Sequence, residues 1–397
     1  METLLTTPPL SLYVHMPWCV RKCPYCDFNS YTLRETLPEA QYVTALERDL
    51  ESQAADVHGR PVVSIFFGGG TPSLFPPEAI GRVLESARRH LDVAPDCEIT
   101  LEANPGTVER GRFTGYREAG VNRVSLGAQS FDARQLEVLG RIHSPAETTR
   151  AAEELHSAGL SNFNLDLMYA LPGQDAAGAA RDVDQALALS PAHLSHYQLT
   201  LEPGTQFAAK PPTLPGDDAA VEMLVACHER LGNAGFTQYE VSGYATADRK
   251  CRHNLNYWLF GDYVGIGAGA HGKVTFPDRG EIVRTTQQRE PRRYLAGSPT
   301  AIARRRVPAA DLPFEFMMNA LRLAGGFGTH LFAERTGLEW TSIAPRIGDL
   351  IDRGLLVLDG PMCTPTALGL RFLNEMLLSF LPESADLAGK RTLSTGS

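Results

Sequence analysis

Six short runs of branched and aromatic residues lie in the first half of the chain, and segments with helical periodicity separate them. The six runs occupy residues 11–16, 62–68, 98–103, 123–128, 163–169 and 193–200. Between them, residues 78–91 and 146–159 repeat their apolar side chains at the spacing of one helical face. Strands that alternate with helices form parallel sheets with right-handed crossovers. We therefore predict an α/β fold. Six repeats suit a partial (β/α)6 barrel, and an open doubly wound sheet is the alternative.

Polar and glycine residues follow several of these predicted strands. The sequence GGGTP (68–72) follows the second strand, Glu102 and Gln129 end the third and fourth, and Asp166 lies in the fifth. In folds of this class, functional residues gather beyond the carboxyl ends of the strands. Each residue alone is equally compatible with a structural turn, but together they predict a site at one rim of the sheet.

Three cysteines, Cys19, Cys23 and Cys26, lie within the eight residues that follow the first predicted strand. A structural zinc ion takes four ligands, commonly from two close pairs, and the other cysteines of this chain are isolated. His15 is the nearest candidate for a fourth ligand, but it lies on a predicted strand. The thiolates of a cubane iron–sulfur cluster suit this spacing better. Three protein ligands would leave one iron open to a small molecule.

The composition of the chain restricts its partners and its cellular compartment. The net charge of −9 and the pI of about 5.7 do not favour a nucleic-acid partner. We find no apolar run long enough for a transmembrane helix and no basic segment followed by an apolar one at the amino terminus, as a secretory signal requires. Seven cysteines, three of them clustered, fit a metal site in a reducing compartment rather than a disulfide framework. These observations predict a cytoplasmic protein.

The sequence CVRKCPYC (19–26), followed by GGGTP, resembles the radical S-adenosylmethionine superfamily. The resemblance implies a [4Fe-4S] cluster held by Cys19, Cys23 and Cys26. It also implies S-adenosylmethionine, bound through its amino and carboxylate groups to the open iron. Glycines suit such a site because they let the backbone approach a ligand without a Cβ clash.

Further motifs are similar to the coproporphyrinogen-oxidase-like branch of that superfamily, and they cover most of the chain. They are YVHMPWCVRKCPYCDF (13–28), FFGGGTPS (66–73), TLEANP (100–105), SLGAQSFD (125–132), LGRIHS (139–144) and NLDLMYALPGQ (164–174). The resemblance implies that S-adenosylmethionine contacts Tyr13, Tyr25, Gly69, Gly70, Thr71, Glu102, Gln129, Arg141 and Asp166. Their chemistry is suitable, since carboxylates accept from ammonium or hydroxyl groups and a guanidinium pairs with a carboxylate.

Two features separate the members of this branch. The oxygen-independent coproporphyrinogen III oxidases carry a further cysteine two residues beyond the third, where this chain has Phe28. The chain also starts only eighteen residues before Cys19, which is too few for the long amino-terminal extension of those oxidases. We therefore do not expect oxidase activity.

HNLNYW (253–258) resembles the HNxxYW signature of the haem chaperones in this superfamily. The resemblance makes His253 the best candidate for a haem ligand, because an imidazole can ligate haem iron. Tyr257 and Trp258 could supply flat apolar faces for a porphyrin. Cys251 is a rival ligand. An aromatic turn in the core with a hydrogen-bonded histidine is the structural alternative.

The remainder predicts smaller units. We expect a barrel over 1–245, the HNxxYW segment and a connection over 246–300, and a carboxyl-terminal helical, winged-helix-like domain over 301–382. A disordered tail is expected over 383–397. The three arginines of 304–306 are expected in a solvated turn.

The expected function is that of a haem chaperone that delivers haem to haem-dependent, for example respiratory, proteins, with a homodimer possible. A coproporphyrinogen III oxidase, or another radical enzyme acting on a tetrapyrrole, is the alternative. A zinc-bound interaction module is a third and remoter one.

Overall fold

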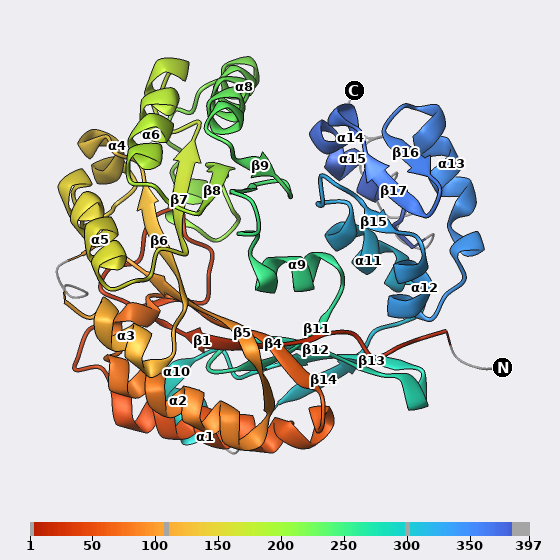
Figure 1. Cartoon of the computed structure of the whole chain (residues 1–397), viewed down its shortest axis with the longest axis horizontal. Helices are drawn as coiled ribbons and strands as arrows, with labels where there is room; N and C mark the ends of the chain where they lie inside the picture. Colours follow the sequence, from red (N-terminus) through yellow and green to blue (C-terminus); the bar gives the residue numbers. More distant parts are fainter. Residues whose placement is uncertain (1–3, 107–110, 298–301, 383–397) are drawn as a thin grey trace.

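The computed structural model describes residues 4–106, 111–297 and 302–382 (Figure 1). All six predicted strands form. They are β1 (Leu10–Met16), β4 (Pro61–Gly69), β5 (Asp92–Ala103), β6 (Arg123–Gln129), β7 (Phe163–Tyr169) and β8 (His193–Gln198). They lie side by side in this order, and every neighbouring pair is parallel. The α/β fold with a parallel six-stranded core is thus confirmed. The predicted tail over 383–397 lies outside the described residues.

Helices follow the strands along the outer side of the curved sheet (Figure 1). They are α1 (Glu39–Ala54), α2 (Pro77–His90), α3 (Phe113–Ala119), α4 (Ala133–Val138), α5 (Pro145–Ser157), α6 (Ala176–Ala188), the short α7 (Gln206–Ala209) and α8 (Asp217–Asn233). The predicted apolar face of α2 is buried, including Ile80, Val83 and Leu84. A capping box between Ser144 and Glu147 fixes the start of α5.

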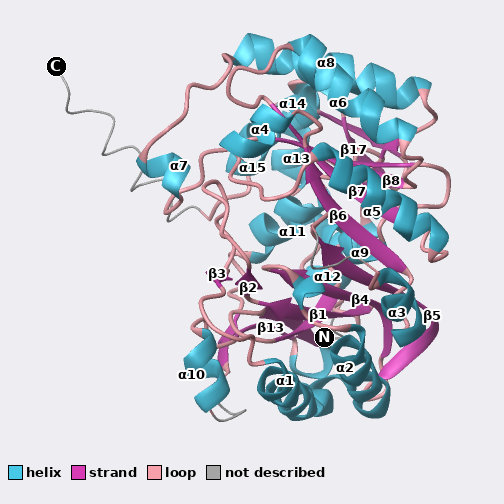
Figure 2. Ribbon diagram, turned by 90° about the vertical axis from the view of Figure 1, so that its left-hand side faces the viewer, coloured by secondary structure: helices cyan, strands magenta, loops and turns pink. Residues whose placement is uncertain are grey.

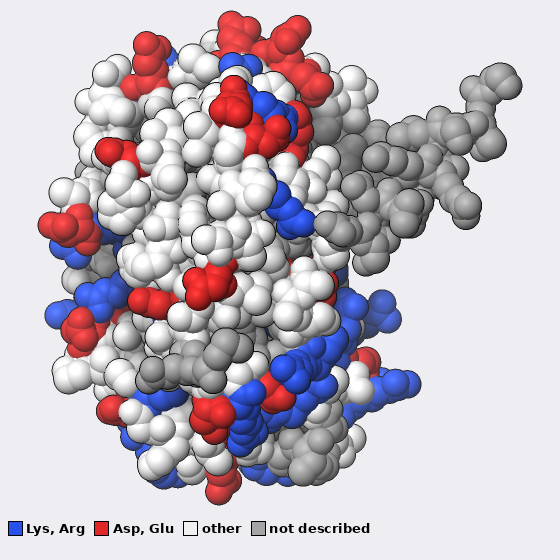
Figure 3. All heavy atoms as spheres, turned by 90° about the vertical axis from the view of Figure 1, so that its right-hand side faces the viewer, with Lys and Arg blue, Asp and Glu red and all other residues white. Residues whose placement is uncertain are grey.

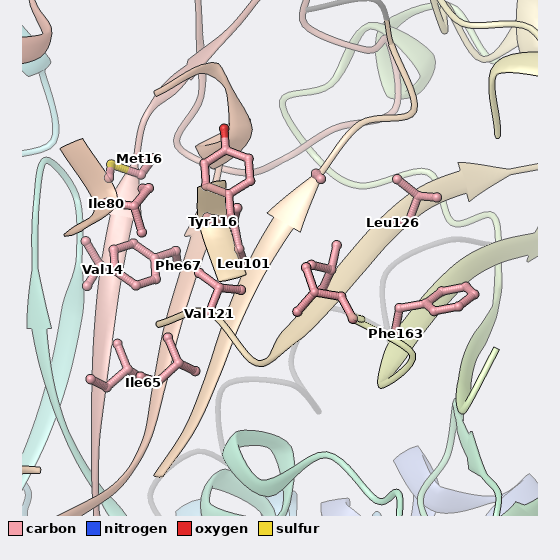
Figure 4. Packing of buried hydrophobic residues seen from close by; sticks show 14 of the residues in the cluster. Val14, Met16, Ile65, Phe67, Ile80, Leu101, Tyr116, Val121, Leu126 and Phe163 are labelled. Atoms are coloured by element: carbon pink, nitrogen blue, oxygen red, sulfur yellow. The ribbon is translucent and has the colours of Figure 1, made fainter. Parts of the chain in front are cut away.

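Alternation along the strands separates the core from the site. In β1, Leu12, Val14 and Met16 belong to the main apolar cluster under the helices, whereas Tyr13 and His15 lie on the opposite face. The same alternation continues along the neighbouring strands, and Figure 4 shows part of the resulting core. Burying one such apolar side chain contributes about 1.5–3 kcal/mol. The core therefore fixes the register that turns the polar residues toward the concave face.

The sheet extends beyond β1 in a way that the sequence did not predict. β11 (Asp262–Ile266) pairs in parallel with β1, and β12 (His271–Phe276), β13 (Glu281–Thr286) and β14 (Ala303–Arg306) follow as antiparallel strands. β10 (Gly243–Ala245) and β9 (Thr237–Gln238) extend the other edge beyond β8. Both edges of the parallel core are thus continued by further strands rather than joined to each other.

The prediction of a solvated turn over 304–306 was wrong, because these arginines belong to the exposed edge strand β14. Figure 3 shows Lys and Arg side chains gathered on the lower half of the face to which β14 belongs. The three arginines form ion pairs with Asp56, with Asp311 and Glu315, and with Glu281. Their charge is therefore partly compensated within the chain.

The carboxyl-terminal unit has helices and a small sheet, as predicted. Its helices are α11 (Leu312–Ala320), α12 (His330–Thr336), α13 (Ala344–Asp352), α14 (Ala367–Arg371) and α15 (Leu373–Leu378), and its sheet contains β15 (Phe327–Gly328), β16 (Leu356–Asp359) and β17 (Met362–Pro365). Buried rings such as Phe316 and Phe332 form its own apolar cluster. Helix α9 (Arg252–Trp258) lies between this unit and the sheet, and α10 (Pro291–Ala296) packs beside α1 (Figures 1 and 2). Among the described residues, no helix combines the length and apolar character needed to cross a membrane.

Candidate functional site

The three clustered cysteines lie on a loop between β1 and α1 (residues 17–33, the cysteine loop). The loop is held by a short parallel pair, β2 (Trp18–Cys19) with β3 (Tyr31–Thr32), and by a turn in which the Cys26 N–H donates to the Cys23 carbonyl at 3.2 Å. All three thiols are half-buried, while the other four cysteines are fully buried. The fold thus sets the clustered thiols apart from the structural cysteines.

The glycine segment after β4 packs against this loop. The Gly70 and Thr71 N–H groups donate to the carbonyls of Met16 and Trp18 at 2.7 and 2.8 Å. A Cβ on Gly70 would lie 2.6 Å from the Trp18 carbonyl oxygen. Gly69 has φ +113°, and a Cβ there would lie 2.5 Å from the His15 ring. Only glycine fits at both positions.

A cavity of about 270 Å³, the smaller cavity, lies at the carboxyl ends of the strands beside the cysteine loop. The predicted residues that line it are Cys19, Cys23, Cys26, Tyr25, Gly69, Gly70, Thr71, Glu102, Gln129, Arg141 and Asp166. Among the predicted cluster and S-adenosylmethionine residues, Tyr13 alone is absent from this lining. The fold therefore brings together residues of four strands, β4 to β7, with residues of the cysteine loop and of the segments that follow β4 and α4.

Two carboxyl groups face this cavity in an environment that disfavours their charge. Glu102 accepts from the Gly69 N–H at 3.1 Å, and burial together with the nearby Asp166 raises the Glu102 pKa to about 8. Asp166 accepts from Asn164 at 2.7 Å and from the Ser125 hydroxyl at 3.3 Å, and burial raises its pKa as well. Because both groups resist ionisation when no cation is present, the pair is suited to a positively charged ligand.

Gln129 and Arg141 are held in fixed positions. Gln129 ends β6 at φ +67°, an unusual conformation for a residue with a side chain, and the Tyr197 hydroxyl donates to its Oε1 at 2.7 Å. The Arg141 guanidinium donates to Asn104 Oδ1 at 2.6 Å and to the Gly127 carbonyl at 2.7 Å, and it lies 3.7 Å from Cys23 Sγ. These bonds place a cation beside the cysteine loop.

Sequence reasoning missed Asn104 and Tyr197, which also line the smaller cavity. Tyr197 stands near the end of β8, and Asn104 directly follows β5. The rule that selected Glu102 and Gln129 applies to both, so the position of a polar residue at a strand end could have identified them.

A larger cavity of about 620 Å³ adjoins the smaller one, and the two share Phe28, Gly69 and Glu102 in their linings. Its walls come from the cysteine loop, from β1, β4, β5, α9 and α11, and from the unpredicted strands β11–β13. Aromatic rings dominate them: Tyr13, Phe28, Phe66, Tyr257, Trp258, Phe260 and Tyr263. The basic residues His15, His271, Lys273, Arg284 and Arg289 also line this cavity. It therefore combines flat apolar surfaces with positive charge.

The HNLNYW segment forms α9, and its residues divide between two environments. Tyr257 and Trp258 line the larger cavity, and His253 is absent from its lining. His253 is 5% exposed, stacks on Phe66 with ring centroids 4.2 Å apart, and donates from Nδ1 to Glu98 at 3.3 Å. Cys251 Sγ lies 3.1 Å from the same nitrogen. Haem ligation by His253 stays a prediction.

Comparisons with known proteins show which families this chain resembles. The model of the Radical SAM superfamily matches residues 13–186, and that of the HemN C-terminal domain matches residues 307–372. The heme chaperone HemW of Escherichia coli (strain K12) is 50% identical over 380 residues, which cover 96% of this chain and 100% of that protein. HemW of Haemophilus influenzae is 47% identical, with 95% and 99% covered. The mitochondrial radical S-adenosyl methionine domain-containing protein 1 of Bos taurus is 35% identical, with 97% and 90% covered.

Among solved structures, coproporphyrinogen III oxidase (HemN) of Escherichia coli shares the fold, with a TM-score of 0.79 over 94% of this chain and 90% of that one. Its sequence is only 22% identical, so this likeness concerns the fold alone. The full-length similarity to the HemW proteins is much stronger. The chain therefore belongs to the radical S-adenosylmethionine superfamily and, within it, to the heme chaperone HemW family.

Proposed function

We propose that this chain is a haem chaperone that holds a [4Fe-4S] cluster and S-adenosylmethionine in the smaller cavity, binds haem next to them, and delivers haem to haem-dependent proteins. One observation carries the proposal. In a chain whose full-length relatives are named heme chaperones, a cavity with three thiols adjoins a larger cavity with aromatic walls and basic groups.

The donor set fits an iron–sulfur cluster. Burial raises the pKa of Cys19 to about 11 and also raises that of Cys26, so these thiols need a bound cation to become thiolates near neutral pH. The lining of the smaller cavity contains no fourth cysteine and no histidine among the described residues, so the thiols do not complete a tetrahedral zinc site. Cys19, Cys23 and Cys26 would hold the cluster, which supplies one electron for cleavage of a sulfonium.

The remaining lining fits S-adenosylmethionine. Glu102 and Asp166 would accept from its amino and hydroxyl groups, and Arg141 would pair with its carboxylate. The backbone of Gly69, Gly70 and Thr71 would run beside S-adenosylmethionine in direct contact with it. Gln129 offers both a hydrogen-bond donor and an acceptor. Tyr25 would pack on the adenine. Tyr13 lines the larger cavity, and its hydroxyl lies 2.7 Å from His15 Nδ1. We therefore assign Tyr13 to the boundary between S-adenosylmethionine and haem.

Phe28 argues against oxidase activity. It takes the position of the further cysteine of the oxidases, is 58% exposed and lines both cavities. An apolar ring there cannot supply the thiol that the oxidases carry. We therefore propose that the chain binds a tetrapyrrole without oxidising coproporphyrinogen III. Respiratory enzymes as haem acceptors, a homodimer and a cytoplasmic location remain predictions.

Haem titration of the anaerobically reconstituted protein tests this function. We expect saturable binding with a Soret band distinct from that of free haem, and no protoporphyrinogen IX after incubation with coproporphyrinogen III and S-adenosylmethionine. Formation of protoporphyrinogen IX in repeated turnovers would favour the oxidase instead.

A further inference from the structure

Two histidines line the larger cavity, and a third lies directly behind its wall. The three differ in the contacts that their ring nitrogens already make. This matters for the proposed function, on which the inference rests, because an iron ligand must present a free imidazole nitrogen to the haem. The candidates are His15 and His271, which line the cavity, and His253, which stacks behind the wall residue Phe66.

The ring nitrogens of both His15 and His253 already contact other groups of the protein. The Nε2–H of His15 donates to the Asn29 carbonyl at 2.9 Å, and its Nδ1 lies 2.7 Å from the Tyr13 hydroxyl. His253 donates from Nδ1 to Glu98, its Nε2 lies 3.3 Å from Cys251 Sγ, and Phe66 covers its ring. Ligation by either would break contacts that the folded chain already makes, and would leave buried polar groups without a partner.

His271 is free of these constraints. It starts β12, its side chain is exposed, and its Nδ1 lies 3.3 Å from the Thr286 hydroxyl. Within the described parts of the chain, its Nε2 contacts no hydrogen-bonding partner. Partial burial of the ring, and then the charges of Arg284 and Arg289, lower the His271 pKa. The imidazole is therefore neutral near pH 7, which is the form that ligates metal ions.

The cations around His271 suit the carboxylates of haem. Lys273 pairs with Asp262 at 2.6 Å and Arg284 with Glu315 at 2.7 Å, so both are already compensated. Arg289 lines the cavity, is exposed, and its guanidinium has no acid partner among the described residues. A cation without an acid partner beside an apolar wall is suited to an amphipathic ligand with carboxylate groups.

We propose that haem enters the larger cavity, that His271 rather than His253 ligates its iron, and that Arg289 pairs with one haem carboxylate. The aromatic walls, Tyr257 and Tyr263 among them, bury the macrocycle. The role of the HNLNYW segment is then to build a wall of the cavity, while the ligand comes from the strand that follows β11.

Spectra of haem titrations in four proteins test the ligand: the parent, His271→Ala, His253→Gln and the exposed control His58→Ala. Only His271→Ala should lose the bands of histidine-bound haem, and added imidazole should restore them. Retained bands in His271→Ala, or their loss in His253→Gln with the cluster absorbance intact, would overturn the assignment. A parent that binds no haem would overturn the proposed function itself, and this inference with it.

A second titration tests the carboxylate contact. Arg289→Gln should weaken haem binding about two- to fivefold, as for a partly exposed ion pair, and should leave the affinity for haem dimethyl ester unchanged. An equal loss for both ligands, or none for haem, would remove Arg289 from the site.

Discussion

Protonation of Glu102 should control the affinity for S-adenosylmethionine, and Glu102→Gln isolates this effect. With a pKa of about 8 before the ligand binds, only about a tenth of the Glu102 side chains are ionised at pH 7. If the carboxylate must be charged to accept from the ligand's amino group, the deprotonation costs about 1.4 kcal/mol at pH 7, which is a factor of about ten in Kd.

The affinity should therefore rise about tenfold between pH 7 and pH 9, and binding at pH 7 should release close to one proton. Neighbouring His15 and His271 do not titrate in this window, because burial lowers the pKa of both. Glu102→Gln should bind more weakly at pH 9 by about 1–3 kcal/mol. It should keep only the pH dependence that comes from the ligand's own amino group, which titrates in the same window for both proteins. Calorimetry in buffers of different ionisation enthalpy measures both quantities.

A conservative control is Glu85→Gln on the exposed face of α2, which should keep the parent's pH dependence. The raised pKa of Glu102 also makes the free energy of unfolding depend on pH. Between the ordinary carboxyl value of 4.5 and about 8, the folded ligand-free protein holds the Glu102 proton and the unfolded chain does not, so the parent should lose stability relative to Glu102→Gln as the pH rises. Flat affinity and no proton release in the parent between pH 7 and pH 9 would refute the reasoning.

The remaining predictions concern the cluster and the scaffold. Changing any one of the three clustered cysteines to Ala should abolish the cluster of about four irons, by iron analysis and absorbance, whereas the buried Cys363 should be replaceable without cluster loss. Gly69→Ala should lower the free energy of unfolding by about 1–3 kcal/mol because of its positive φ; Gly81→Ala, inside α2, should raise it instead. Lys273→Met should lower it by about 3 kcal/mol, because Asp262 loses its fully buried partner and keeps only the partly buried Arg60. Urea unfolding measures all three stability changes, and an unchanged Lys273→Met midpoint would contradict the last.

The parallel core could be predicted because its strands are short runs of branched and aromatic residues that alternate with segments of helical periodicity. Strands β11 and β14 lacked this signal. β11 is followed by a glycine-rich segment, and β14 consists of exposed arginines and one alanine. Their strand conformation comes from pairing with neighbours that the local sequence does not specify.

The functional site also has one part that the sequence could predict and another that it could not. Glu102, Gln129 and Asp166 could be predicted because strand polarity alone brings their positions to one rim. The larger cavity could not, because α9, α11 and the added strands meet only in the folded chain. His253 illustrates the limit: the motif singles it out, yet nothing in the local sequence shows that Phe66 and Glu98 enclose its ring.

The most direct test of the proposed function is haem transfer. Cluster-containing protein loaded with one haem is mixed anaerobically with a haem-free acceptor protein, and the Soret bands of donor and acceptor are followed in time. The acceptor band should grow as the donor band decays, faster than the release of haem to a non-protein scavenger. Decay at the same rate with acceptor and scavenger would show passive dissociation and would contradict delivery.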